Sequence, residues 1–217
     1  MSGPGFYGKI ASRGDFVSRD LPQTFIQPWD TWLAAGMLAS QQQLGSAWLD
    51  AYLVSPLWRF ALAPGVCGPQ AVVGVLMPSI DRVGRYFPLT LAVILEDDQG
   101  LASLVGGADQ WFEQAEQTLL DTLEPGATFE AFETGLRRLG RPAPVLRGPT
   151  SEFAGLQRFD ATTPEARLAA MAEQACMGAS LWWGKGSHSI APGLLRCQGL
   201  PATAEFGRFL LGQEASV

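Results

Sequence analysis

The sequence predicts an α/β protein in which helices cover both faces of a mixed central sheet, a three-layer αβα sandwich. The first observation is a pair of almost uninterrupted apolar runs, residues 71–77 and 88–95, which are typical of strands buried on both faces. The second is that segments with helical spacing of apolar residues precede and follow these runs. The third is that 47% of the 217 residues are hydrophobic, which is ample for one core. We therefore expect a single domain over residues 1–217.

The first hundred residues hold one strongly periodic segment. Ile26, Trp29, Leu33 and Met37 recur at helical spacing and predict a helix, with Pro28 in its first turn. The other elements expected before the two apolar runs are a short strand at residues 6–10, a helix at 44–53 and a strand at 58–62.

In the second half, hydroxyl residues mark the helix starts. Thr128, Thr163 and Thr203 are expected N-caps, because a threonine hydroxyl accepts a hydrogen bond from a free backbone N–H of the first turn. Residues 140–159, rich in proline and glycine, predict an extended loop. The remaining expected elements are helices at 108–123, 128–139, 163–176 and 203–211 and strands at 180–183 and 194–197.

Charge and composition exclude several classes of partner. The net charge is −6 and no block of Lys and Arg is present, which argues against nucleic acid and against anionic membrane surfaces. The apolar runs are far shorter than the roughly 20 residues of a bilayer span, so we expect no membrane insertion. The first residues lack the pattern of a secretory signal, and we expect a cytoplasmic protein.

Neither a metal site nor a disulfide framework is expected. The three cysteines, Cys67, Cys176 and Cys197, are widely spaced and include no Cys-x-x-Cys pair. His188 is the single histidine, so nitrogen and sulfur ligands are too few for a zinc site. We expect no cofactor.

Two glycine-punctuated segments, residues 8–16 and 77–88, carry the densest charge in the chain. One interpretation is a recess that grips a carboxylate or phosphate of a partner protein, because arginine offers planar bidentate donors. The other is that Asp15 and Asp81 pair internally with the basic side chains and fasten the loops to the sheet. The candidate partner-binding residues are Lys9, Arg13, Asp15, Arg59, Asp81, Arg82 and Arg85.

Catalysis is the weaker interpretation of the same residues. Asp15 and Asp81 are candidates for an acid and base pair in a small phospho-group hydrolase with arginine clamps, but nothing in the sequence sets their separation. No nucleophile-elbow pattern and no phosphate-binding glycine motif occurs. We expect a binding protein rather than an enzyme, with a structural subunit of an assembly as a further alternative.

Several motifs follow one another in the first hundred residues of the chain. They are Gly5-Phe6-Tyr7-Gly8-Lys9, Ser12-Arg13-Gly14-Asp15-Phe16, Pro28-Trp29-Asp30, Ser55-Pro56-Leu57-Trp58-Arg59-Phe60 and Met77-Pro78-Ser79-Ile80-Asp81-Arg82-Val83-Gly84-Arg85-Tyr86-Phe87-Pro88. In this order they resemble the TagF (ImpM) family of bacterial type VI secretion accessory proteins. The resemblance implies an α/β/α fold, a role in repressing secretion after translation, and binding to the forkhead-associated-domain scaffold protein of that system. It implies no catalytic residues.

Overall fold

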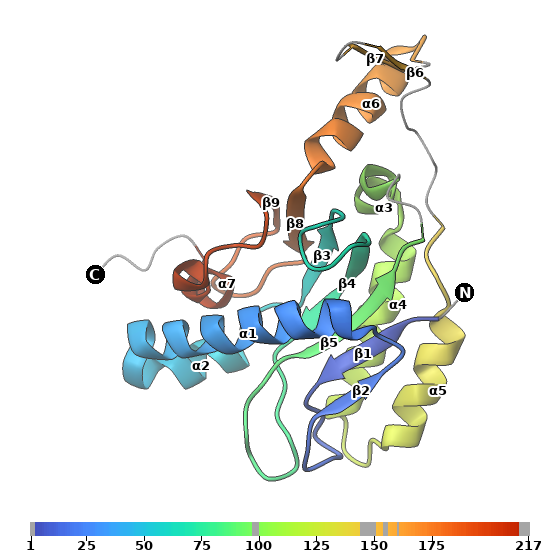
Figure 1. Cartoon of the computed structure of the whole chain (residues 1–217). Coiled ribbons are helices and arrows are strands. Elements are labelled where there is room, and N and C mark those ends of the chain that lie inside the picture. Colours follow the sequence, from blue (N-terminus) through green and yellow to red (C-terminus); the bar gives the residue numbers. More distant parts are fainter. Residues whose placement is uncertain (1–2, 97–99, 144–150, 154–155, 160, 213–217) are drawn as a thin grey trace.

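The chain is a mixed α/β protein built on a seven-stranded sheet (Figure 1). The computed structural model describes residues 3–96, 100–143, 151–153, 156–159 and 161–212. The strand order among these residues is β2-β1-β5-β4-β3-β8-β9. The strands are β1 (Gly5–Gly8), β2 (Val17–Arg19), β3 (Trp58–Leu62), β4 (Val72–Met77), β5 (Leu89–Ile94), β8 (Ala179–Gly184) and β9 (Gly193–Gln198), and a separate pair is formed by β6 (Ser151–Phe153) and β7 (Leu156–Arg158).

Most of the helices belong to two groups along the chain. One group precedes β3 and the other lies mostly between β5 and β8. The α-helices are α1 (Gln23–Leu44), α2 (Trp48–Leu53), α3 (Leu101–Gly107), α4 (Asp109–Leu120), α5 (Phe129–Leu139), α6 (Pro164–Cys176) and α7 (Gly207–Leu211), with 3-10 turns at Gly45–Ala47, Asp121–Leu123 and Thr203–Glu205.

The predicted mixed sheet is wrong in strand direction. Every pairing between the strands of the described residues is antiparallel. Four of the neighbouring pairs, β1–β2, β3–β4, β4–β5 and β8–β9, are joined by connections without a helix, so the chain reverses at each. Parallel neighbours need a crossover connection, and the two helical connections, β2 to β3 and β5 to β8, join strands that are not neighbours in the sheet.

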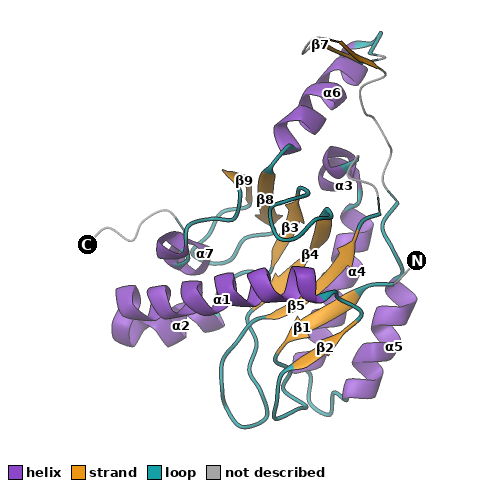
Figure 2. Cartoon of the chain, in the orientation of Figure 1, coloured by secondary structure: helices purple, strands orange, loops and turns teal. Residues whose placement is uncertain are grey.

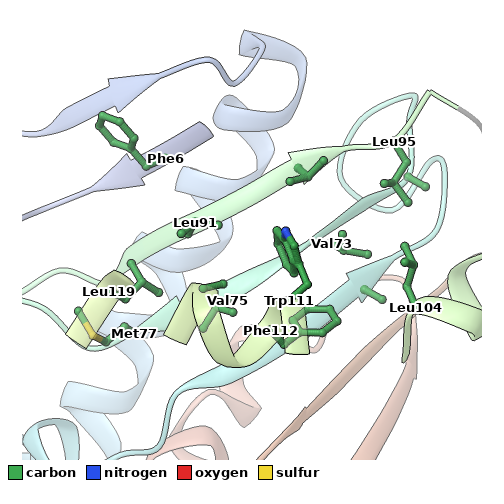
Figure 3. Packing of buried hydrophobic residues seen from close by; sticks show 14 of the residues in the cluster. Phe6, Val73, Val75, Met77, Leu91, Leu95, Leu104, Trp111, Phe112 and Leu119 are labelled. Carbon is green, nitrogen blue, oxygen red and sulfur yellow. The ribbon is translucent and has the colours of Figure 1, made fainter. Parts of the chain in front are cut away.

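Successive side chains along a strand belong to two different hydrophobic clusters. Val73 and Val75 of β4 pack with Phe112 of α4 in one cluster, together with residues of α3 and α5 (Figure 3). Val72 and Leu76 belong to the other cluster, which holds residues of α1, α2 and α7. Because successive strand residues point to opposite faces, the near-continuous apolar run of β4 supplies both clusters. Figure 2 shows α1 and α4 beside the orange strands of the sheet.

Adjacent tryptophans of β8 contribute to different clusters, as expected for neighbours in a strand. Trp182 is fully buried and its ring lies parallel to that of Trp29 of α1, with centroids 6.0 Å apart. Trp183 packs edge-on against Phe112 of α4 at 4.8 Å. These two contacts connect β8 to helices of both clusters.

The expected caps of α5 and α6 are confirmed. The Oγ1 atoms of Thr128 and Thr163 accept hydrogen bonds from the N–H groups of Ala131 and Ala166, each at 3.1 Å. Both helices therefore begin where local chemistry predicts.

Other boundaries differ from expectation. Helix α1 begins at Gln23, so Pro28 lies inside the helix rather than in its first turn. The expected helix at 203–211 is interrupted at Phe206, and Thr203 makes no capping hydrogen bond. Strand β2 and helix α3 were not expected, because neither is long enough to show a clear period.

The segment expected as an extended loop, residues 140–159, contains a strand pair. Strands β6 and β7 pair antiparallel there, with Glu152 opposite Gln157, and residues 144–150 and 154–155 lie outside the described part. In Figure 1 this pair lies at the far end of α6, which projects away from the sheet.

Candidate functional site

The two charged motifs form neighbouring loops at one end of the sheet. Residues 9–16 connect β1 to β2, and residues 78–88 connect β4 to β5. The strand register places Gly8 and Met77 on either side of Leu89, so both loops leave the sheet from adjacent positions. The loops bring together four basic and two acidic side chains, a surplus of two positive charges in a chain of net charge −6.

Asp81 is the buried centre of this loop pair. One carboxylate oxygen accepts hydrogen bonds from the N–H groups of Val83 at 3.0 Å and Arg85 at 2.9 Å. The other contacts Lys9 Nζ at 3.0 Å and Arg85 Nε at 2.7 Å, and the side chain is 0% exposed. Burial by itself raises the pKa of Asp81, but the hydrogen bonds from Arg85, Lys9 and Val83 outweigh burial and lower that pKa. The carboxylate is held as an anion that joins the two loops.

Arg85 continues the connection to the first loop. The hydrogen bond and charge of Asp81 raise the pKa of Arg85. The Arg85 guanidinium also donates to the carbonyl of Gly14 and lies 3.6 Å from the Asp15 carboxylate. Asp15 and Asp81 thus contact the same guanidinium from different environments, because the Asp15 side chain is 99% exposed and that of Asp81 is buried.

Arg13 turns toward α5 instead of joining the recess. Its guanidinium pairs with Glu130 at 3.1 Å and lies 4.7 Å from the centre of the Phe129 ring. These contacts anchor the first loop to the start of α5.

Arg82 is the loop arginine available to another molecule. Its backbone N–H donates to the Arg13 carbonyl at 2.9 Å, which holds the residue in place. Its side chain is exposed near Gly14, where an added Cβ atom would lie 3.6 Å from Arg82 Nη2. Within the described part of the chain, no ion pair or side-chain hydrogen bond engages this guanidinium.

Arg59 of β3 lies in a separate cluster with two acidic residues of α4. Its Nε and Nη2 donate to the two carboxylate oxygens of Glu116 at 2.6 and 3.1 Å, and Nη1 donates to Asp109 at 2.6 Å. Burial lowers the pKa of Arg59, but the hydrogen bonds and charges of Glu116 and Asp109 outweigh it and leave that pKa raised. The Arg59 side chain is 5% exposed and ties β3 to α4.

Two apolar residues of the loops were not among the predicted site residues. Phe16 is 48% exposed, and its ring lies 4.9 Å from Phe87 and 5.7 Å from Tyr7. Val83 is 64% exposed beside Arg82. Each directly follows a charged residue of a motif, and this position in the sequence could have marked both as candidate site residues. We define Phe16, Arg82 and Val83 as the loop surface.

The described residues offer no metal-binding constellation. None of them forms a group of three or more His, Cys, Asp or Glu side chains arranged for an ion. Cys67, Cys176 and Cys197 are free thiols, and burial raises the pKa of Cys67 to about 12. None of the described helices combines the length and apolar character that crossing a bilayer requires.

Comparison with known proteins shows the family of the chain and a similar solved structure. The family model described as TagF N-terminal domain, type VI secretion system-associated, matches residues 5–139, which include both charged loops and Arg59. The crystal structure of PA0076 from Pseudomonas aeruginosa PAO1 is 60% identical in sequence, with a TM-score of 0.92 over 99% of this chain and 96% of that chain. No functionally curated protein matches the chain.

Proposed function

The chain belongs to the TagF family of type VI secretion system-associated proteins, and from this membership we propose that it is a cytoplasmic negative regulator of that system. It acts after translation by binding the forkhead-associated-domain scaffold protein, without catalysis and without a cofactor.

The loop surface is the observation that carries the binding proposal. Arg82 is exposed and its backbone is fixed, while Val83, the next residue, and Phe16 of the adjoining loop expose apolar side chains. An arginine flanked by apolar side chains is a frequent energetic centre of protein interfaces. The positive charge of the exposed Arg82 favours an acidic segment of the partner.

The contacts of the two aspartates count against the alternative of a phospho-group hydrolase. Asp81 is buried with both oxygens engaged, and its lowered pKa makes it a poor proton donor or acceptor near pH 7. The Asp15 side chain is 99% exposed and lies 3.6 Å from the Arg85 guanidinium, so it faces solvent rather than an enclosed site.

The test is the affinity of the purified chain for the purified scaffold protein, measured by calorimetry. We expect the wild-type chain to bind, and Arg82→Glu to weaken binding at least about tenfold, because a central arginine is replaced by a repelling carboxylate. Arg138→Glu, an equal charge change at an exposed position of α5, is the matched control and leaves the affinity unchanged.

Two outcomes contradict different parts of the proposal. A wild-type chain that does not bind the scaffold protein refutes the named partner. An Arg82→Glu variant that binds as tightly as the wild type, while its circular dichroism is unchanged, refutes the loop surface.

A further inference from the structure

A second candidate binding site is a pocket of about 320 Å³ that shares no residue with the loop surface. It lies between the connection from α2 to β3, one face of α4 and the loop after β8. Its lining residues include Leu57, Glu113, Glu116, Leu120 and Lys185.

The walls of the pocket are held in fixed positions. Gly184 approaches the connection from α2 to β3 so closely that an added Cβ atom would lie 2.6 Å from the Leu57 carbonyl oxygen. Glu116 is buried and is fixed by the two hydrogen bonds from Arg59. The pocket is therefore formed by α4 and by two connections that contact each other closely at Gly184.

The charges at the pocket wall do not balance. Arg59 and Lys185 supply two positive charges, whereas Asp109, Glu113 and Glu116 supply three negative charges within one connected cluster. Arg59 is already engaged by Glu116 and Asp109. One negative charge remains in excess within this cluster, of which Glu113, Glu116 and Lys185 line the pocket.

The contacts of Lys185 show that the two glutamates of the pocket bind a cationic side chain. Its ammonium lies 3.3 Å from Glu113 and 3.5 Å from Glu116, yet its side chain is 66% exposed. A surface ion pair of this kind contributes little to stability, so the lysine can leave its position at small cost. The place between the two carboxylates is thus occupied by a replaceable cation of the chain itself.

Apolar surface extends beyond the pocket. Val54 and Leu120 line the pocket and are 55% and 39% exposed, and Leu53 beside them is 58% exposed. A free amino acid or a polyamine inside the pocket would leave this surface uncovered, whereas a peptide with aliphatic residues next to its basic residue would cover it.

We propose that this pocket receives an arginine side chain from an aliphatic segment of a partner protein, in the position that the Lys185 ammonium now occupies. The guanidinium pairs with Glu113 and Glu116, since its planar donors match carboxylate oxygens. The inference does not depend on the identity of the scaffold partner.

The test uses a defined peptide and the full chain. Acetyl-Leu-Arg-Leu-amide is titrated into the ¹⁵N-labelled chain, and the amide shifts of Gln117, Lys185, Gly186 and Ser187 report binding at the pocket. Lys185→Ala removes the competing cation, and we expect it to tighten binding at least about threefold. Glu113→Gln is expected to weaken binding by a similar factor.

Matched variants separate a site effect from the general charge of the chain. Arg138→Ala makes the same charge change as Lys185→Ala outside the pocket, and Glu124→Gln makes the same change as Glu113→Gln, so neither alters the affinity. The amide spectrum of each variant verifies that its fold is retained.

Three results would overturn the inference. The first is equal binding of the peptide in which citrulline, uncharged and of nearly the same shape, replaces arginine. The second is an affinity that Lys185→Ala leaves unchanged. The third is binding of arginine amide as tight as that of the peptide, which assigns the pocket to a small cation instead of a partner segment.

Discussion

Asp81 and Arg82 are neighbours in one motif, yet they have different roles. Asp81 is buried and receives hydrogen bonds from Lys9 and from the backbone and side chain of Arg85. Arg82 is exposed beside these contacts. At this scale the two interpretations of the charged motifs are compatible, because one residue fastens the loops and the next is presented by them.

We expect Asp81→Asn to lower the urea midpoint of unfolding at pH 7, because it leaves the buried Lys9 ammonium without its anion. Since the folded pKa of Asp81 is lowered, its stabilising contribution is present above the unfolded pKa of about 4 and declines as the pH falls toward the folded pKa. The difference from the wild type is therefore large at neutral pH and shrinks below about pH 4.

Denaturation series at several pH values measure this difference. Asp15→Asn is the control, because the Asp15 side chain is 99% exposed, and we expect it to change the midpoint little. A constant deficit of Asp81→Asn across the acid range would contradict the role of the ionised carboxylate.

Gly36 of α1 allows the Phe206 ring to lie close to the helix backbone. A Cβ atom added at Gly36 would lie 2.7 Å from Cγ of Phe206, which follows the 3-10 turn at Thr203–Glu205. The Phe206 ring packs against Trp32 at 5.4 Å and Phe209 at 5.8 Å, so it has little room to move. Gly106 of α3 has no atom within 4 Å of such a Cβ.

Replacing glycine by alanine is therefore expected to change the free energy of unfolding in opposite directions in the two helices. Alanine is favoured over glycine in a helix by about 1 kcal/mol, but overpacking a core costs about 1–3 kcal/mol. We expect Gly36→Ala to destabilise the chain by up to roughly 2 kcal/mol and Gly106→Ala to stabilise it by roughly 0.5–1 kcal/mol. Urea unfolding measures both free energies, and a stabilised Gly36→Ala variant would show that the Phe206 ring moves aside.

The seven-stranded sheet includes strands that lie outside residues 5–139, the region that matches the family model. Strand β8, which begins at Ala179, pairs with β3, and Trp182 is fully buried against Trp29 and Phe60. The region up to residue 139 and the region after it therefore share one sheet. On this basis we propose that residues 1–217 unfold as one domain.

We expect a single urea transition, with coincident midpoints by far-UV circular dichroism and by tryptophan fluorescence. Trp182→Ala should lower the free energy of unfolding by about 3–5 kcal/mol, because it empties a fully buried site between β8 and α1. Both probes should still coincide in that variant. Two separated transitions in the wild type would mean that the C-terminal strands form an independent unit.

Local chemistry accounts for several elements that could be predicted from the sequence. Strands β3, β4 and β5 follow from short apolar runs, and the starts of α5 and α6 follow from threonine hydroxyls that accept first-turn hydrogen bonds. The motif loops were found in the same way, since charge and glycine are concentrated there.

The tertiary structure decided which distant residues meet. The antiparallel strand order, the approach of Phe206 to Gly36 and the pairing of Arg59 with Glu116 all join residues far apart in the chain. Composition and periodicity say which side chains are buried or charged, but the choice of partner depends on how whole elements pack. For the same physical reason, only the folded arrangement separates Asp81, which holds the loops together, from Arg82, which is exposed beside them.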